Sequence, residues 1–254
     1  MISFFSEKGL KVEEVVGSSS NSYFLCEGGE LFGAGHAEEG RLGDPELITN
    51  PDTPILISKD VERVFSGPIA INVFITKLDG SVWSFGNNDF NQRGFEGNEP
   101  KDWGIRFHED LTSNEIIKIA CGYWNTIILK EGGRIYGAGK SDFICGFDGK
   151  SFQPIPGLGD DLVFIDIEAV SKHSLALSQD YQVFGWGWNN FGQLGLGDRK
   201  ERMNPEKLEL PSGLKSGPIT IHCGPNSSWI LQGDWRPERY SRLLLIEDLN
   251  DFEY

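Results

Sequence analysis

Few residues of this chain have the types and spacing that catalysis or metal binding requires. His173-Ser174 would pair a base with a nucleophile, but neighbours in a strand point to opposite faces and cannot bond as a dyad. Cys121 and His222-Cys223 suggest metal ligands, yet both cysteines fall at one place in two copies of a repeat, where packing of a small residue explains them. We therefore predict no catalytic residue and no metal site.

Cofactor binding has equally weak support in the sequence. The glycines at 185, 187 and 192 lack the spacing and the following helix of a dinucleotide-binding fingerprint. The charged run at 198–201 predicts a polar loop between strands rather than a phosphate site. We therefore expect no cofactor, and these glycines instead belong to a repeated structural motif.

A motif of aromatic residues and glycines occurs four times. Its copies lie at 31–36, 82–87, 135–140 and 183–195. Aligned on the second glycine (Gly35, Gly86, Gly139 and Gly187), they recur at intervals of 51, 53 and 48 residues. A period near fifty made of short β-rich pieces is typical of a propeller or solenoid, in which one unit cannot bury its apolar face alone.

A second motif, small-Cys-Gly-x-x-polar-small-apolar, precedes the first in each unit. Its best copies lie at 120–127 and 222–229, with looser ones near 16–23, 66–74 and 168–175. Between the two motifs lie hairpin signals such as Asp79-Gly80 and Glu131-Gly132-Gly133. Each unit is therefore predicted to contain about four strands and no helix.

The order of the two motifs resembles the repeat of the regulator of chromosome condensation (RCC) family. The resemblance covers about 16–231 and is closest at 168–198. It implies an all-β fold, an RCC-type β-propeller. Five copies of one motif and four of the other predict about five blades of four antiparallel strands, in a ring closed by strands from both termini, with 232–250 completing the last blade. The alternative is an open arc, whose two unpaired edges would invite dimerisation.

Length and composition fit one such domain over residues 1–254. We expect repeat units near 16–66, 67–119, 120–167, 168–221 and 222–250, and an acidic tail at 247–254. The formal charge of −15 repels a phosphate backbone, so we expect no direct nucleic-acid binding. No apolar stretch is long enough for a membrane span. The four cysteines are predicted to be reduced, buried thiols of a cytoplasmic or nuclear protein.

Candidate binding residues are large side chains at positions that vary between units. Trp188 occupies a slot held elsewhere by His36, Asn87 and Lys140. Because such slots are expected to face solvent, a tryptophan there is a candidate anchor, the alternative being packing beneath a neighbouring loop. The candidate partner-binding residues are Trp188, Trp124, Tyr123, Lys172 and Asn226. Trp229, in an apolar slot of its unit, is predicted to be core.

The resemblance also implies functions. The chain most resembles the alpha-tubulin suppressor-like propellers of fungi, which implies a non-enzymatic interaction propeller that binds a small zinc-binding protein of the diphthamide pathway. Such a pair supports diphthamide synthesis and Elongator-dependent modification of the tRNA wobble uridine. One alternative is guanine-nucleotide exchange on a Ran-type small GTPase, although the negative charge and the small number of repeats weigh against it. Another is a tubulin- or ubiquitin-linked regulatory binding module.

Overall fold

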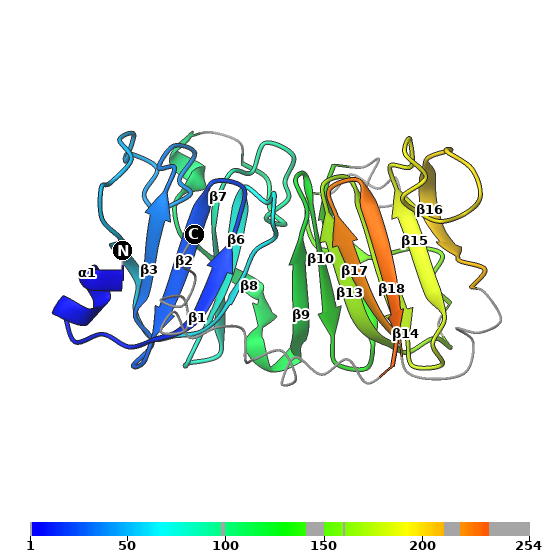
Figure 1. The fold of residues 1–254 in the computed structure, drawn as a ribbon, viewed down its shortest axis with the longest axis horizontal. Helices are drawn as coiled ribbons and strands as arrows, with labels where there is room; N and C mark the ends of the chain where they lie inside the picture. The colour runs from blue at the N-terminus through cyan, green and yellow to red at the C-terminus, as the bar shows by residue number, and fades with distance from the viewer. Residues whose placement is uncertain (1, 98–99, 141–149, 160, 211–218, 234–254) are drawn as a thin grey trace, which may run out of the picture.

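The structure, a computed structural model, describes residues 2–97, 100–140, 150–159, 161–210 and 219–233 (Figure 1). One short helix, α1 (Ile2–Glu7), precedes the strands, and 3-10 turns lie at Pro100–Trp103 and Ser113–Glu115. The strands are β1 (Val12–Gly17), β2 (Asn21–Cys26), β3 (Leu31–Gly35), β4 (Ile55–Ser58), β5 (Val61–Phe65), β6 (Asn72–Lys77), β7 (Ser81–Gly86), β8 (Arg106–Thr112), β9 (Ile116–Cys121), β10 (Asn125–Lys130), β11 (Arg134–Gly139), β12 (Gln153–Pro154), β13 (Phe164–Val170), β14 (His173–Ser178), β15 (Val183–Gly187), β16 (Arg202–Lys207), β17 (Ile219–Gly224) and β18 (Ser227–Gln232).

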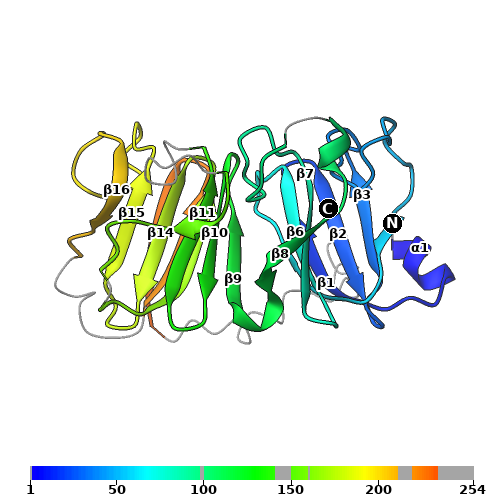
Figure 2. The same ribbon diagram turned by 180° about the vertical axis from the view of Figure 1, so that it is seen from behind.

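The strands form five sheets, which we call blades 1 to 5. Blades 1 to 4 each contain four strands that pair antiparallel in chain order, from β1–β4 to β13–β16, and the described part of blade 5 is the β17–β18 hairpin. Successive blades contact one another through their first two strands (Figures 1 and 2). The prediction of an all-β propeller with about five blades of antiparallel strands is confirmed.

The first strands of blades 1 to 4 face one another. A cavity of about 450 Å³ lies between them, lined by residues of β1, β5, β9 and β13 such as Glu14, Arg63, Lys118 and Ile165. Two cations tie neighbouring blades here. Arg63 donates to the carbonyl of Ile117 in blade 3 (2.9 Å). Lys118 binds carboxylates of blade 4, and these are Asp166 (2.8 Å) and Glu168 (2.7 Å).

In blades 1 to 4 the second strand is buried on both sides, because its alternating residues contact different neighbours. One side, which we call the forward face, meets the next blade, and the backward face meets the preceding one. At one position on the forward face, four blades carry residues that are at most 1% exposed, namely Tyr23, Phe74, Ile127 and Leu175.

Trp229 occupies the same position in blade 5 and is 58% exposed, so the prediction that it is core is wrong. In the other blades the following blade covers this position. No sixth sheet lies against β18 among the residues that the structure describes.

Polar residues at the start of the second strand join consecutive blades by hydrogen bonds. The Asn72 amide donates to Thr126 Oγ1 (3.1 Å), and the Asn125 amide donates to Ser174 Oγ (3.2 Å). The His173 ring bonds Ser228 Oγ (3.1 Å). Burial lowers the pKa of His173 to about 4, so its imidazole is neutral at pH 7. The His-Ser motif is therefore a tie between blades 4 and 5.

Helix α1 lies outside the repeat and has no precedent in the sequence motifs. It lies beside the sheet of blade 1 (Figure 1). It packs on the backward face of that blade, where the ring of Phe5 lies 5.1 Å from Phe24 and 5.7 Å from Phe32. Within the described ranges, no helix has the length and apolarity to cross a membrane.

Several predictions fall partly outside the described residues. Cys26, Cys121 and Cys223 are free thiols, while Cys145 lies in an undescribed stretch. The closing strand expected from 232–250 and the tail at 247–254 also lie outside the described residues, apart from 232 and 233. In the described part no ladder joins blade 1 to blade 5, so ring closure stays a prediction.

Candidate functional site

The variable positions of the repeat lie side by side in every complete blade. The first slot is the residue before the second strand, and the second slot is the residue after the third strand. In each blade the second-slot N–H donates to the first-slot carbonyl. These bonds join His36 to Ser20 (3.2 Å), Asn87 to Ile71 (3.0 Å), Lys140 to Trp124 (2.8 Å) and Trp188 to Lys172 (2.8 Å).

The repeated second glycine makes this pairing possible. Gly139 has φ +121°, and a Cβ there would lie 2.3 Å from the carbonyl oxygen of Trp124. The equivalent glycines of the other three blades have φ between +94° and +121°, and a Cβ would lie 2.2–2.5 Å from the first-slot oxygen. Only glycine permits both the conformation and the close approach.

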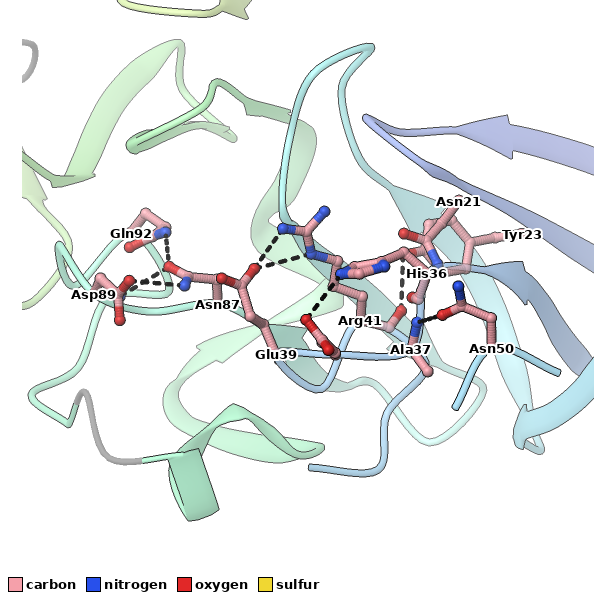
Figure 3. Close-up of polar contacts among 11 residues, drawn as sticks. Asn21, Tyr23, His36, Ala37, Glu39, Arg41, Asn50, Asn87, Asp89 and Gln92 are labelled. Atoms are coloured by element: carbon pink, nitrogen blue, oxygen red, sulfur yellow. Dashed lines mark hydrogen bonds and ion pairs between the residues drawn. The ribbon is translucent and has the colours of Figure 1, made fainter. Parts of the chain in front are cut away.

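The slots of blades 1 and 2 hold Ser20, His36, Ile71 and Asn87, none of which is a tryptophan or a lysine. Asn21 donates to the carbonyl of His36 (2.7 Å), and Gln92 donates to Asn87 Oδ1 (2.9 Å), as Figure 3 shows. Asn87 is only 1% exposed. The expectation that this slot faces solvent is therefore wrong for blade 2, because the loop after β7 folds back over the amide.

Blades 3 and 4 carry a tryptophan and a lysine in opposite slots. Blade 3 has Trp124 in the first slot and Lys140 in the second, whereas blade 4 has Lys172 in the first and Trp188 in the second. The exchange places the four side chains in alternation across the two blades. The ammonium of Lys140 lies 4.7 Å from the Trp124 ring, and that of Lys172 lies 4.5 Å from Trp124 and 5.4 Å from Trp188. We call these four residues the Lys–Trp row.

Further aromatic rings flank the row. Phe90 lies 4.9 Å and Tyr123 5.2 Å from Trp124. Phe191 lies 5.2 Å from Trp188 and is 62% exposed. The four row residues and Tyr123 are half-buried. Four of the five candidates are thus brought together, while Asn226 is exposed in the equivalent slot of blade 5 and joins the row through none of the described contacts.

Sequence reasoning placed Lys140 in a variable slot but did not select it as a binding residue, and it did not consider Phe90 or Phe191. Lys140 occupies the same slot as Trp188, and a matching of both slots between neighbouring blades would have found it. Phe90 and Phe191 each lie four residues after the second glycine of their unit. The shared repeat position of these residues was therefore visible in the sequence. Their contacts with the two tryptophans become visible only in the folded blades.

The chemistry available at this surface is binding. A lysine ammonium over an indole is held by the electrostatic attraction of the ring face and keeps N–H donors for another acceptor. Burial raises the pKa of the Cys121 thiol to about 12, so it is neither a nucleophile nor a thiolate ligand at pH 7. The described part of the chain contains no cluster of three metal-binding side chains.

Two family models, both described as the regulator of chromosome condensation (RCC1) repeat, match the chain. One matches residues 79–129 and 180–231, and the other matches 116–145 and 164–193. The chain belongs to the RCC1 repeat family. Both elements of the Lys–Trp row, the turn before the second strand and the end of the third, lie within the matched RCC1 repeats.

RCC1-repeat relatives of this chain are mostly longer proteins. It is 29% identical to the human E3 ubiquitin-protein ligase HERC2 over 87% of this chain and 5% of that protein. It is 26% identical to the ultraviolet-B receptor UVR8 of Arabidopsis thaliana over 84% of this chain and 49% of the receptor. The chain therefore spans about half or less of these relatives.

Solved structures show the same fold. Yeast RCC1 (Prp20), solved bound to Kap60, superposes with a TM-score of 0.74 at 20% identity, over 92% of this chain and 57% of that one. Human WBSCR16 gives a TM-score of 0.73 at 21% identity, over 89% of this chain and 58% of its own. At such identities the likeness shows the RCC1 propeller fold alone.

Proposed function

We propose that this chain is a non-catalytic, protein-binding RCC1 propeller whose partner contacts the Lys–Trp row. One observation carries the proposal. Two blades hold a tryptophan and a lysine in exchanged slots, so that Lys172 lies within 5.4 Å of both Trp124 and Trp188. Residues that only maintain the propeller are common to the blades, whereas the equivalent slots of blades 1 and 2 hold neither tryptophan nor lysine.

The row has the properties of an interaction hot spot. Tryptophan is among the residues that contribute most to interface energies, and half-buried rings held by neighbours lose little rotamer entropy on binding. No ion pair engages Lys172 among the described residues, so its ammonium keeps donors for a carboxylate or carbonyl of the partner. These features support binding through a mixed apolar and cationic surface.

The identity of the partner rests on resemblance. The motif at 223–231 and the Gly185-Trp186-Gly187-Trp188 stretch favour a small zinc-binding protein of the diphthamide pathway, and with it a role in diphthamide synthesis and wobble-uridine modification. The first alternative is nucleotide exchange on a Ran-type small GTPase. Prp20p of Saccharomyces cerevisiae, which shares this fold, has binding properties toward Gsp1p and histones. The second is a ubiquitin-linked or tubulin-linked binding module, which the HERC2 relationship favours for ubiquitin.

Affinity capture from a cytoplasmic extract distinguishes these partners, and purified components then test the surface. We expect a small zinc-binding protein to be captured, and nucleotide release from a purified Ran-type GTPase to be unchanged by the chain. Capture of a GTPase together with accelerated release would replace the first partner by the exchange activity. Capture of ubiquitin-pathway proteins or tubulin would favour the second alternative.

Substitutions test the row itself. We expect Trp124→Ala and Trp188→Ala each to weaken binding of the captured partner by about 2 kcal/mol, roughly thirty-fold. The matched control is Trp83→Ala in blade 2, which removes another half-buried tryptophan under a lysine (Lys77 Nζ, 5.1 Å). If both row variants stay folded and bind like the control, the Lys–Trp row is not the binding surface.

A further inference from the structure

The four interfaces between consecutive blades are built in one way. The forward face of one second strand meets the backward face of the next. The backward-facing residues that fill these interfaces are aliphatic, namely Ile75, Ile128, Ala176 and Ile230. A blade therefore carries two complementary apolar faces, and an unpaired one is a surface that fits another blade of the same kind.

The two ends of the array differ in what covers these faces. On blade 1, α1 lies on the backward face, and the clustered residues Phe5, Phe24, Phe32 and Cys26 are at most 8% exposed. On blade 5, the forward face is open in the described part of the chain. Trp229 is 58% and Leu231 41% exposed there. One end is thus capped by a helix, and the other presents large apolar side chains to solvent.

We propose that the forward face of blade 5 docks the backward face of blade 1 of a second copy of this chain, and that α1 is the cap that prevents it. Phe24 occupies the position of Ile75, Ile128, Ala176 and Ile230, the residues that fill the internal interfaces. With α1 in place, Phe5 occupies the space that an incoming forward face needs. Release of α1 exposes the Phe24 and Phe32 rings to Trp229 and Leu231 of the second copy.

Helix α1 can detach from blade 1 because it has little stability of its own. A helix of six residues is far below the length of about 12–15 residues that is marginally stable alone, so α1 depends on its contacts. Those contacts are aromatic. Phe5 lies against Phe24 and Phe32, and Phe4 lies 5.9 Å from Phe32. Because the two docking faces differ, the contact is heterologous, and it joins copies head to tail rather than as a closed pair.

Sedimentation velocity on the chain of 254 residues tests the proposal. We expect the unsubstituted chain to stay monomeric between about 1 and 100 μM. The double variant Phe4→Ser/Phe5→Ser, which releases α1, should form a series of growing oligomers over the same range. Adding Trp229→Ser to the double variant should restore the monomer. The matched control is Ile48→Ser in the double variant, which removes another exposed apolar side chain (73% exposed) and should leave assembly unchanged.

A mixing experiment tests the direction of docking. In the triple variant only the backward face of blade 1 is able to dock, because Trp229 has been removed from blade 5. In the unsubstituted chain only the forward face of blade 5 is able to dock, because α1 covers blade 1. Their mixture should stop at a one-to-one dimer. Near-ultraviolet circular dichroism reports whether the double variant unfolds. If it does, Phe5→Ala is used in its place, and we expect the same series of oligomers at higher protein concentration.

Three results would overturn the inference. The first is a released variant that is folded yet monomeric at about 100 μM. The second is assembly that survives Trp229→Ser. The third is Trp229-dependent assembly of the unsubstituted chain, because α1 would then not be the cap.

Discussion

Replacement of Gly139 by alanine is a direct perturbation of the contact that pairs the two slots. The added Cβ would lie 2.3 Å from the carbonyl oxygen of Trp124 and 2.7 Å from the Cα of Asn125. Both atoms belong to the backbone, so no flexible side chain can move aside. The strands must separate by roughly 1 Å to reach ordinary contact, and this stretches the bond from the Lys140 N–H to Trp124.

The expected cost follows from these contacts. A non-glycine residue at φ +121° is strained by about 1–3 kcal/mol. Stretching the hydrogen bond from the Lys140 N–H leaves the carbonyl of Trp124 poorly paired, and this adds about 1–2 kcal/mol. We therefore expect Gly139→Ala to lower the free energy of unfolding by about 3–5 kcal/mol. Gly132→Ala is the control, because Gly132 has φ +78° and open space around its Cβ position. Its strain of about 1–2 kcal/mol is partly offset by a lower entropy of the unfolded chain.

Urea unfolding, followed by tryptophan fluorescence and far-ultraviolet circular dichroism, measures both free energies. The two variants share backbone strain, so their difference isolates the close approach, and we expect at least about 2 kcal/mol. Near-ultraviolet circular dichroism should change for Gly139→Ala alone, since Trp124 moves. A difference below about 0.5 kcal/mol, with equal m-values, would refute the reasoning that the second glycine exists to seat the first-slot carbonyl.

The remaining predictions concern two buried basic side chains, His173 and Arg93. Because the pKa of His173 is about 4 when folded and about 6.5 when unfolded, the unfolded chain takes up the proton first, and stability falls as the pH drops from about 6.5 to about 4. Asparagine occupies this place in blades 1, 2 and 3. His173→Asn should flatten that part of a urea-midpoint profile, and an unchanged slope would contradict the assignment. Arg93 is fully buried and donates five hydrogen bonds to the Ser84 hydroxyl and to carbonyls of Ser84, Gly86, Asp102 and Gly104. Arg93→Lys should cost about 2–4 kcal/mol in urea unfolding, because three ammonium donors cannot reach five fixed acceptors, and a cost below about 1 kcal/mol would show that the bonds are not needed.

The spacing of motifs was enough to predict the propeller, since glycines, hairpin signals and alternating apolar residues act within one blade. The sequence also argued against a His173-Ser174 dyad, because neighbours in a strand point to opposite faces. The bond from His173 to Ser228 of blade 5 appeared only in the tertiary structure. Arg93 shows the limit of this reasoning. It takes the place of Leu42 and Leu194 in the repeat, yet its burial is possible only because five oxygens converge on it.

The candidate surface was predicted in part. Trp124, Tyr123, Lys172 and Trp188 were identified as large side chains in variable slots, whereas their contact across two blades was not. Asn87 was expected to face solvent and is buried, because its loop folds over it. Trp229 was expected in the core and is exposed, because burial on a forward face depends on the blade that follows.

The sequence by itself determined the period, the strand order within a blade and the places where glycine is obligatory, since these depend on backbone geometry between near neighbours in the chain. Tertiary structure alone decided which lysine lies over which tryptophan, where α1 docks and which apolar face stays open. Those outcomes depend on contacts between residues of different strands and blades, and the same residue type is buried or exposed according to what packs beside it.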